Sequence, residues 1–277
     1  CIMSDPRNAL EAIGQLPDAE IDIADAALQL ARVDMPDADW EAARAALSLL
    51  AREAVAVAEG IGPEDLAEQA VALQRLVAGG HGYRGDSETY DDPANANLIR
   101  VVARRRGLPV ALGVVWLHAA HAAGWAAHGV DFPGHFLIAL AGAGEQVVLD
   151  VFDAGRRLDA RALRALLTTF EGAQAEWRPD LLRPMGSRAV LLRLQNNIKL
   201  RRLRAGDLPG ALACTEDMLR IAPEEASQWR EAGLMNSRLD RVAAALRCYE
   251  RFLALLPTGE TAERVRAAMD ELRSRLN

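Results

Sequence analysis

The sequence predicts an α+β chain in two parts, a helix-rich domain that contains one β-hairpin and a set of helical repeats behind it. Residues 20–33 and 38–60 repeat apolar residues at three- and four-residue spacing, which is typical of amphipathic helices. Residues 135–152 switch to the two-residue alternation of strands. From about residue 188 onward the chain repeats itself after 34 residues. We therefore expect a first domain over residues 1–185 and repeats over residues 186–277.

Composition narrows the classes of function. With 277 residues, 51% of them hydrophobic, the chain is long enough to bury a core in each of two domains. A net charge of −7 argues against nucleic acid as a main partner. No apolar run reaches the length of about 18 residues that a membrane span needs, and we expect neither a signal peptide nor a membrane partner. Three cysteines make no disulfide framework and favour the cytoplasm. Cys1 precedes Met3, which makes Met3 a candidate natural start.

The middle of the first domain combines a polar loop with an apolar helix. A helix is expected from Pro63, followed by two acids, to Gly79-Gly80. Residues 81–97 are rich in Gly, Asp, Asn and Ser and predict a long loop, of a length that is often functional. A short helix to residue 106 should end in the solvated arginine run 104–106. Pro109 then opens a helix that is apolar nearly all round and ends near Gly124, so we expect it to be central and buried.

Residues 135–152 predict a hairpin with its turn at residues 141–144. A turn centred between Gly142 and Ala143 would set Leu140 opposite Glu145 and His135 opposite Asp150. Directly opposed residues have Cβ atoms about 4.5–5.5 Å apart, close enough for a carboxylate to orient an imidazole.

The C-terminal repeat follows the tetratricopeptide pattern. The shift of 34 residues superposes Ala211 on Ala245, Cys214 on Cys248 and Pro223 on Pro257, among other pairs. The second copy has a tryptophan, a glycine, an alanine, an aromatic residue and a proline at the pattern's positions, namely Trp229, Gly233, Ala245, Tyr249 and Pro257. Residues 260–276 predict a capping helix. Two repeats seldom stand alone, because stacked neighbours supply the core.

Four side chains that could bind a metal or act as nucleophiles are better explained as packing residues. His118 and His121 lie three residues apart on one helix, a spacing that can bind a metal, but no HExxH or CxxC motif accompanies them. We predict no metal and no cofactor. Cys214 and Cys248 lie at equivalent repeat positions between apolar residues and are expected to be packing thiols.

His135 and Asp150 are the strongest catalytic candidates. A carboxylate-held imidazole is the base of serine and cysteine triads, and the nucleophile of such a triad would lie at a helix N-terminus. The helix that fits begins with Pro109, Val110 and Ala111, so Cys, Ser and Thr are all missing there.

The segments YDDPANANLIRVVARRRGLPVALGVVWLHAA, GVDFPGHFLIAL and VVLDVFDAGRRL together resemble the transglutaminase-like core of the bacterial SirB family. The resemblance covers about residues 35–257. It implies a papain/transglutaminase-like core, with helices packed on a small antiparallel sheet, followed by all-α tetratricopeptide repeats. In catalytic relatives a Cys at the helix start precedes a His and an Asp on successive strands. His135 and Asp150 match the last two, whereas Pro109 to Ala111 depart from the pattern at the first.

Two functions remain open at this point. The first is a non-catalytic scaffold that binds a protein partner or has a regulatory role, through the repeat groove with Trp229 or through the polar loop with Tyr90, Asp92 and Asn95. The alternative is a hydrolase or acyl transferase in which His135 acts as general base and Asp150 orients it, with water or a non-standard nucleophile.

Overall fold

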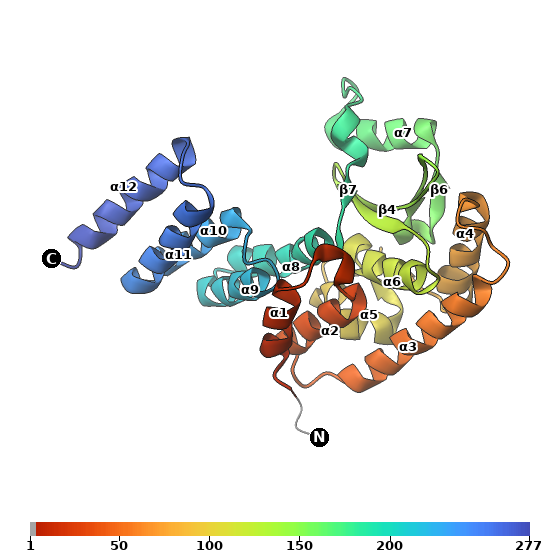
Figure 1. The fold of residues 1–277 in the computed structure, drawn as a ribbon, viewed down its shortest axis with the longest axis horizontal. Helices are drawn as coiled ribbons and strands as arrows, with labels where there is room; N and C mark the ends of the chain where they lie inside the picture. The colour runs from red at the N-terminus through yellow and green to blue at the C-terminus, as the bar shows by residue number, and fades with distance from the viewer. Residues whose placement is uncertain (1–3) are drawn as a thin grey trace. The chain divides into compact units, whose positions relative to one another are not determined.

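The computed structural model describes residues 4–277, so the expectation about Cys1 and Met3 falls outside the described residues. The chain forms two compact units (Figure 1). The core unit comprises residues 17–194, and the repeat unit comprises residues 195–277 together with the described N-terminal residues up to Leu16. The expected division was at residues 185/186. The observed one falls inside α8 (Ser187–Arg204), a continuous helix with no breaker to mark it.

Aspartates begin the first three α-helices of the core unit. Asp22, Asp39 and Asp65 each accept a hydrogen bond from a backbone N–H of the first turn that follows, which satisfies a donor that the helix itself cannot. The helical elements up to the sheet are a 3₁₀ turn (Asp18–Glu20), α2 (Ile23–Asp34), α3 (Trp40–Val57), α4 (Leu66–Leu73), a π-helical turn (Gln74–Gly80), a second 3₁₀ turn (Pro93–Ala96), α5 (Leu98–Arg104) and α6 (Pro109–Ala122).

Helix α6 is the central element of the core unit, as its apolar sequence predicts. All but three of its fourteen residues are buried. Gly113 allows a strand to approach, because a Cβ at this position would lie 2.3 Å from the ring of Phe136. On another side, Nε2 of His118 lies 2.8 Å from the carbonyl oxygen of Leu47 in α3. The helix therefore joins the helical layer to the sheet.

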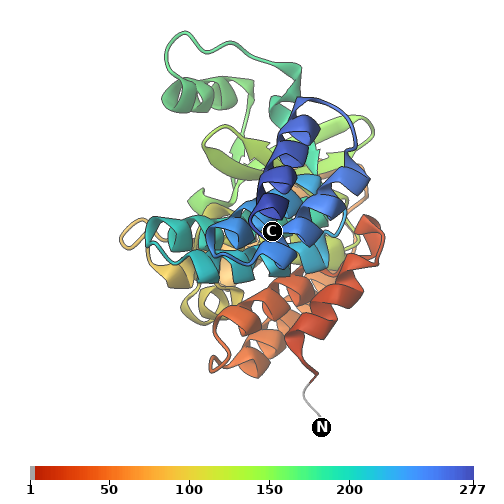
Figure 2. The same ribbon diagram turned by 90° about the vertical axis from the view of Figure 1, so that its left-hand side faces the viewer.

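The core sheet is antiparallel and has the strand order β6-β5-β4-β3-β7. Its strands are β3 (Ala127–Phe132), β4 (His135–Gly142), β5 (Glu145–Asp150), β6 (Arg156–Leu158) and β7 (Pro184–Met185). Helix α6 lies against one face and α7 (Ala160–Glu171) against the other (Figures 1 and 2). Alternation along β4 divides the side chains, so that Phe136 contacts α6 whereas Leu137 and Ala139 join the apolar cluster under α7.

The hairpin β4–β5 has a register two residues away from the expected one. Gly142 pairs with Glu145 and Leu140 with Val147, so the predicted opposition of His135 and Asp150 is wrong. The turn is Ala143-Gly144, with φ of 49° and 78°. Positive φ at both central residues is the type I′ geometry that matches strand twist, and it moves the turn one residue beyond the expected centre.

The repeat unit consists of two helical pairs and a cap. The first pair is α8, of which this unit holds the part from Gln195, with α9 (Leu208–Ile221), and the second pair is α10 (Ala226–Arg238) with α11 (Val242–Leu255). Helix α12 (Glu260–Ser274) packs on α11 as the expected cap. Gly233 has the role that the repeat pattern requires, because a Cβ there would lie 2.5 Å from the ring of Tyr249.

The N-terminal helix α1 (Pro6–Gly14) belongs to the repeat unit and packs against α9. The two backbones approach so closely at Gly14 that a Cβ would lie 2.0 Å from the carbonyl oxygen of Arg220. Arg7 Nε also lies 3.2 Å from a carboxylate oxygen of Asp217. The sequence alone did not reveal this pairing, because its two partners are about 200 residues apart.

Lys199, the only lysine of the chain, is 2% exposed on α8. Its Nζ donates to the side chains of Gln228 and Glu231 on α10. The ammonium group is therefore paired inside the repeat unit and links α8 to α10, the first helices of the two repeats.

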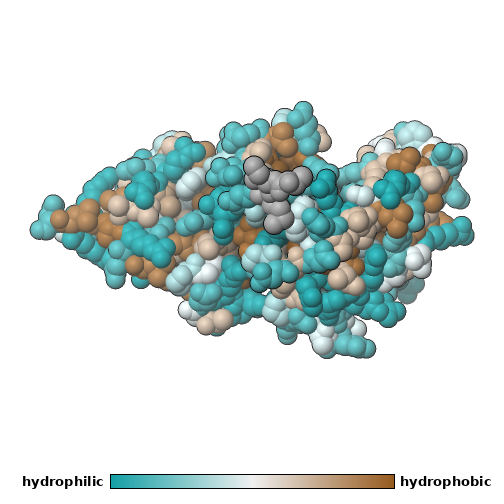
Figure 3. Space-filling model, turned by 90° about the horizontal axis from the view of Figure 1, so that it is seen from below, coloured by the Kyte–Doolittle hydropathy of each residue, from teal (hydrophilic) through white to brown (hydrophobic). Residues whose placement is uncertain are grey.

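Polar residues dominate the surface in Figure 3, and hydrophobic ones form small groups among them. Within residues 4–277, no helix combines the length and apolar composition needed to cross a bilayer.

Candidate functional site

His135 and Asp150 are hydrogen-bonded to each other on the sheet. The His135 Nε2 atom lies 2.9 Å from Oδ1 of Asp150. Continuing the observed register would place Asp150 opposite Leu137, two residues along from His135 on the same face of the sheet. Diagonal neighbours of this kind are about 7–8 Å apart at Cα, within reach of long side chains. The predicted pair therefore forms although the predicted register was wrong.

Two phenylalanines enclose the imidazole. The ring of Phe170, near the end of α7, stacks on His135 at 6.1 Å between centroids and an angle of 14°. Phe152 contacts His135 edge-on at 6.3 Å, and its backbone N–H donates to the same Asp150 oxygen that His135 contacts. The His135 side chain is 15% exposed, and its Nδ1 atom has no hydrogen-bond partner among residues 4–277. Neither phenylalanine stands out in the sequence, because the loop and helix that carry them show no spacing that relates them to His135.

The start of α6 presents no nucleophilic side chain. Its first residues, Pro109, Val110 and Ala111, are all buried. Leu108 is the N-cap residue and supplies no side-chain cap, while its backbone N–H donates to the carbonyl oxygen of Asn95 at 3.0 Å. The place where a triad would hold its Cys or Ser is therefore occupied by packed apolar groups.

The polar loop wraps around this helix start. A two-residue parallel pairing joins β1 (Arg84–Gly85) to β2 (Arg106–Gly107), directly before α6. A Cβ at Gly85 would lie 2.4 Å from the Phe152 ring, so glycine is needed for this close approach. The ring of Tyr90, 49% exposed, contacts Phe152 edge-on at 6.0 Å. Of the three predicted loop residues, Tyr90 is thus the one connected through Phe152 to His135.

Asn95 and Asp92 hold the loop in shape. Asn95 is fully buried, and its amide nitrogen donates to Oδ2 of Asp86 and to two loop carbonyls. Its amide oxygen accepts from Arg104 at 3.1 Å. Asp92 caps the 3₁₀ turn by accepting from the backbone N–H of Ala94. The Asn95 amide is therefore already fully engaged within the protein.

Asp86 is the centre of this network, although it was not among the residues predicted from the sequence. It is 5% exposed and accepts from the backbone N–H and hydroxyl of Thr89, from Asn95 and from Arg104. The hydrogen bond from the Thr89 hydroxyl, followed by the one from the Thr89 backbone, holds the pKa of Asp86 well below its usual range. An Asp three residues before a Thr in a polar loop was the one available signal, since such pairs form Asx turns.

The arginine run is not a solvated helix end. Arg104 binds Asp86 and Asn95. Arg105 adopts a left-handed conformation at φ 57° and lies over the Tyr83 ring, 4.7 Å from its centroid. Arg106 donates to the carbonyl oxygen of Gly82. The expectation of solvation was wrong because the folded loop supplies a partner for each of the three guanidinium groups.

The two histidines and two cysteines that were expected to be packing residues lie in structural contacts. His118 and His121 each contact a backbone carbonyl oxygen, of Leu47 and Ala127. Cys214 is fully buried against Gln195, and burial raises the pKa of the Cys248 thiol. No group of three or more potential metal ligands forms within residues 4–277.

The repeat unit has a groove of about 630 Å³ between α1, α9, α10 and α11. Trp229 lines it, donates its indole N–H to the carbonyl oxygen of Pro223 at 2.8 Å, and lies beneath the Arg251 guanidinium. The charged side chains that line the groove are Glu11, Glu216, Arg220, Arg247 and Arg251. Trp229 is therefore both a packing residue between the repeats and part of a concave surface.

Comparisons with known proteins agree with this architecture. Residues 41–196 match the transglutaminase-like superfamily, and residues 198–270 match the tetratricopeptide repeat. A UPF0162 protein of Xylella fastidiosa strain Temecula1 is 31% identical over 207 residues, which cover 73% of each chain. Another UPF0162 protein, of Vibrio cholerae, is 28% identical over 91% of this chain and 93% of its own. Protein SirB1 of Salmonella typhimurium is 24% identical over 74% of this chain and 76% of its own.

The chain belongs to the transglutaminase-like superfamily and, within it, to the UPF0162 family, whose members include SirB1. The predicted α+β core with C-terminal tetratricopeptide repeats is thereby confirmed.

Proposed function

We propose that this protein is a non-catalytic transglutaminase-like scaffold of the bacterial cytoplasm whose tetratricopeptide repeats bind a protein partner. The observation that carries the proposal is the start of α6, where Pro109, Val110 and Ala111 are buried and offer no hydroxyl or thiol. A carboxylate-held base without a nucleophile cannot form an acyl-enzyme. The net charge of −7 makes protein, and not nucleic acid, the preferred class of partner.

The groove of the repeat unit supports this reading. Its volume of about 630 Å³ suits the side chains of a bound segment, and Trp229 offers the kind of aromatic surface that carries much of the binding energy in interfaces. Arg247 is exposed, lines the groove and has no ion-pair partner within the described chain. We expect an acidic side chain of the partner to bind there.

The test asks whether binding of a protein partner depends on the groove of the repeat unit or on His135. Capture from a bacterial lysate is compared for the wild type, Arg247→Glu in the groove, Arg241→Glu outside it, and His135→Gln. Charge reversal in the groove should reduce recovery of the captured protein at least about tenfold, because an attractive pair becomes a repulsive one. Arg241→Glu and His135→Gln should recover it as the wild type does. Equal capture by both arginine variants would contradict the groove assignment.

The alternative is a hydrolase or acyl transferase that uses His135 as base toward water or a substrate hydroxyl. The observation that favours it is the Nδ1 atom of His135, which has no hydrogen-bond partner among residues 4–277, while Asp150 holds the Nε2 atom of the same ring. Wild-type protein and His135→Gln are assayed against a panel of amides and esters. Turnover by the wild type that disappears in His135→Gln would overturn the scaffold proposal. We expect the wild type to turn over none of the amides and esters of the panel.

A further inference from the structure

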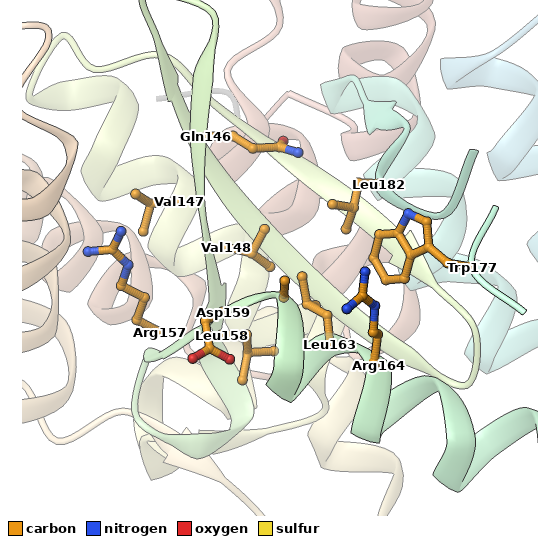
Figure 4. Close-up of a pocket in the computed structure, with 11 residues that line it drawn as sticks. Gln146, Val147, Val148, Arg157, Leu158, Asp159, Leu163, Arg164, Trp177 and Leu182 are labelled. Atoms are coloured by element: carbon orange, nitrogen blue, oxygen red, sulfur yellow. The ribbon is translucent and has the colours of Figure 1, made fainter. Parts of the chain in front are cut away.

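A second pocket lies in the core unit, on the α7 side of the sheet. It has a volume of about 360 Å³ and is formed by β5, β6, the first half of α7 and the segment that follows α7 (Figure 4). This volume is at the lower end of the range for small-molecule sites, about 300–1,000 Å³. Its lining residues do not include His135, Asp150 or Phe170, so it is a site apart from the histidine pair.

The alternation of the strands decides which side chains face the pocket. Val148 pairs with Leu158, and both belong to the apolar cluster under α7. Arg157 pairs with Leu149 and therefore points to the opposite face of the sheet. Figure 4 shows the same division: Arg157 and Val147 lie on one side of β5, while Val148, Leu163, Leu182, Arg164 and Trp177 lie on the other. The floor is thus aliphatic and the guanidinium group in the pocket is that of Arg164.

Three polar groups at the rim lack partners in the part of the chain that the structure describes. The Gln146 amide, the Arg164 guanidinium and the Trp177 indole N–H make no side-chain hydrogen bond or ion pair there. The one acid of the lining, Asp159, is used otherwise, since its carboxylate accepts from the backbone N–H of Ala162 and caps α7. The rim therefore offers unpaired donors above an apolar floor.

Trp177 makes one wall of the pocket. Its ring packs on Phe132 at 6.4 Å and 43° and is still 40% exposed. A neighbouring cavity of about 550 Å³ shares Gln146, Trp177 and Leu182 with this pocket. A tryptophan that is anchored along one side and exposed along the other offers a flat surface to a ligand ring.

We propose that this pocket binds a small amphipathic anion, an aromatic carboxylate. Its carboxylate accepts hydrogen bonds from the Arg164 guanidinium, which matches a carboxylate with two parallel donors, and from the Gln146 amide. Its ring packs on Trp177 over the floor of Val148, Leu158 and Leu163. A cation of the same shape gains nothing from Arg164 and is excluded.

The test titrates the full-length chain with phenylacetate and follows the indole N–H resonances by NMR, with Trp177→Phe identifying the one that belongs to Trp177. Phenylacetate should move the Trp177 resonance saturably. Arg164→Gln should raise the Kd for phenylacetate about tenfold, since charge-assisted hydrogen bonds are lost. Arg161→Gln, on the same helix but outside the lining, should leave the Kd unchanged, as should His135→Gln.

Phenethylamine, a cation of similar size, and acetate, which has no ring, complete the design. Neither should move the Trp177 resonance at the concentrations where phenylacetate saturates it. Three outcomes would each overturn the proposal: an unmoved resonance with phenylacetate, equal binding of the amine, or the same Kd for Arg164→Gln and Arg161→Gln. None of these readouts depends on the repeat groove or on His135, so they are distinguishable from failure of the scaffold proposal.

Discussion

Asp86 shows how a single buried carboxylate can organise a candidate site from outside it. Through Asn95 and Arg104 it fixes the loop whose other end holds Leu108 at the start of α6. Tyr90 extends from the same loop to Phe152, and Phe152 contacts His135. The surroundings of the histidine thus depend on a residue that does not touch it.

Asp86→Asn is expected to lower the melting temperature at pH 7, because the amide cannot accept from Thr89 and Arg104 as the carboxylate does. The pKa of Asp86 is depressed in the folded state, so its stabilisation is present above the unfolded pKa of about 3.9 and is lost as the pH falls below it. Thermal unfolding from pH 7 to pH 3 measures this. The difference between wild type and variant should be largest near neutrality and shrink below about pH 4. A difference that stays constant over this range would show that the charge is not what stabilises the loop.

At the scale of elements, the hairpin turn shows what alternation can and cannot predict. The two-residue period of residues 135–152 identified both strands and the faces of their side chains. It could not fix the register, because a shift by two residues leaves every side chain on the same face. Register depended on Ala143-Gly144, where alanine adopts a positive φ that sequence patterns assign to Gly, Asn or Asp. Because such a shift keeps both side chains on one face, the sequence could predict that His135 and Asp150 lie near each other. It could not predict which residues they stand opposite.

The turn gives two opposite predictions. Ala143→Asn should raise the free energy of unfolding by about 0.5–1 kcal/mol, since asparagine tolerates positive φ better than alanine. Gly144→Ala should lower it by about 1 kcal/mol, because φ is 78° there. A Cβ at Gly144 would have no heavy atom within 4 Å, so the loss is conformational and not steric. Urea unfolding of both variants measures the effects. Equal effects of both variants would contradict the type I′ geometry.

On the scale of the whole molecule, the chain has two compact units with separate cores. One cluster packs Val130 and Leu137 of the sheet against Leu167 of α7, and another packs Tyr249, Phe252 and Met269 at the end of the repeats. The repeat pattern and the family resemblance predicted both architectures. Neither predicted that α1 would pack on α9, because its partners become neighbours only once the chain has folded.

Separate cores predict separate unfolding transitions in calorimetry. Gly233→Ala should shift only the transition of the repeat unit, at a cost of about 1–3 kcal/mol, because the new methyl group overlaps the Tyr249 ring. Leu137→Ala should shift only that of the core unit, by about 2–5 kcal/mol. Gly62→Ala is the control, since a Cβ there would meet open space. A single transition that moves with both Gly233→Ala and Leu137→Ala would show that the two units unfold together.

The buried position of Lys199 has a consequence for the chemistry that can be done on this protein. Reagents that acylate amines find no exposed lysine side chain on the folded chain, since its only one is 2% exposed and bound to Gln228 and Glu231. Acylation of Lys199 therefore requires α8 and α10 to separate. The rate at which an activated ester labels Lys199 therefore reports how often the repeat unit opens. Mass spectrometry of the peptide that contains Lys199 measures this rate without an engineered probe.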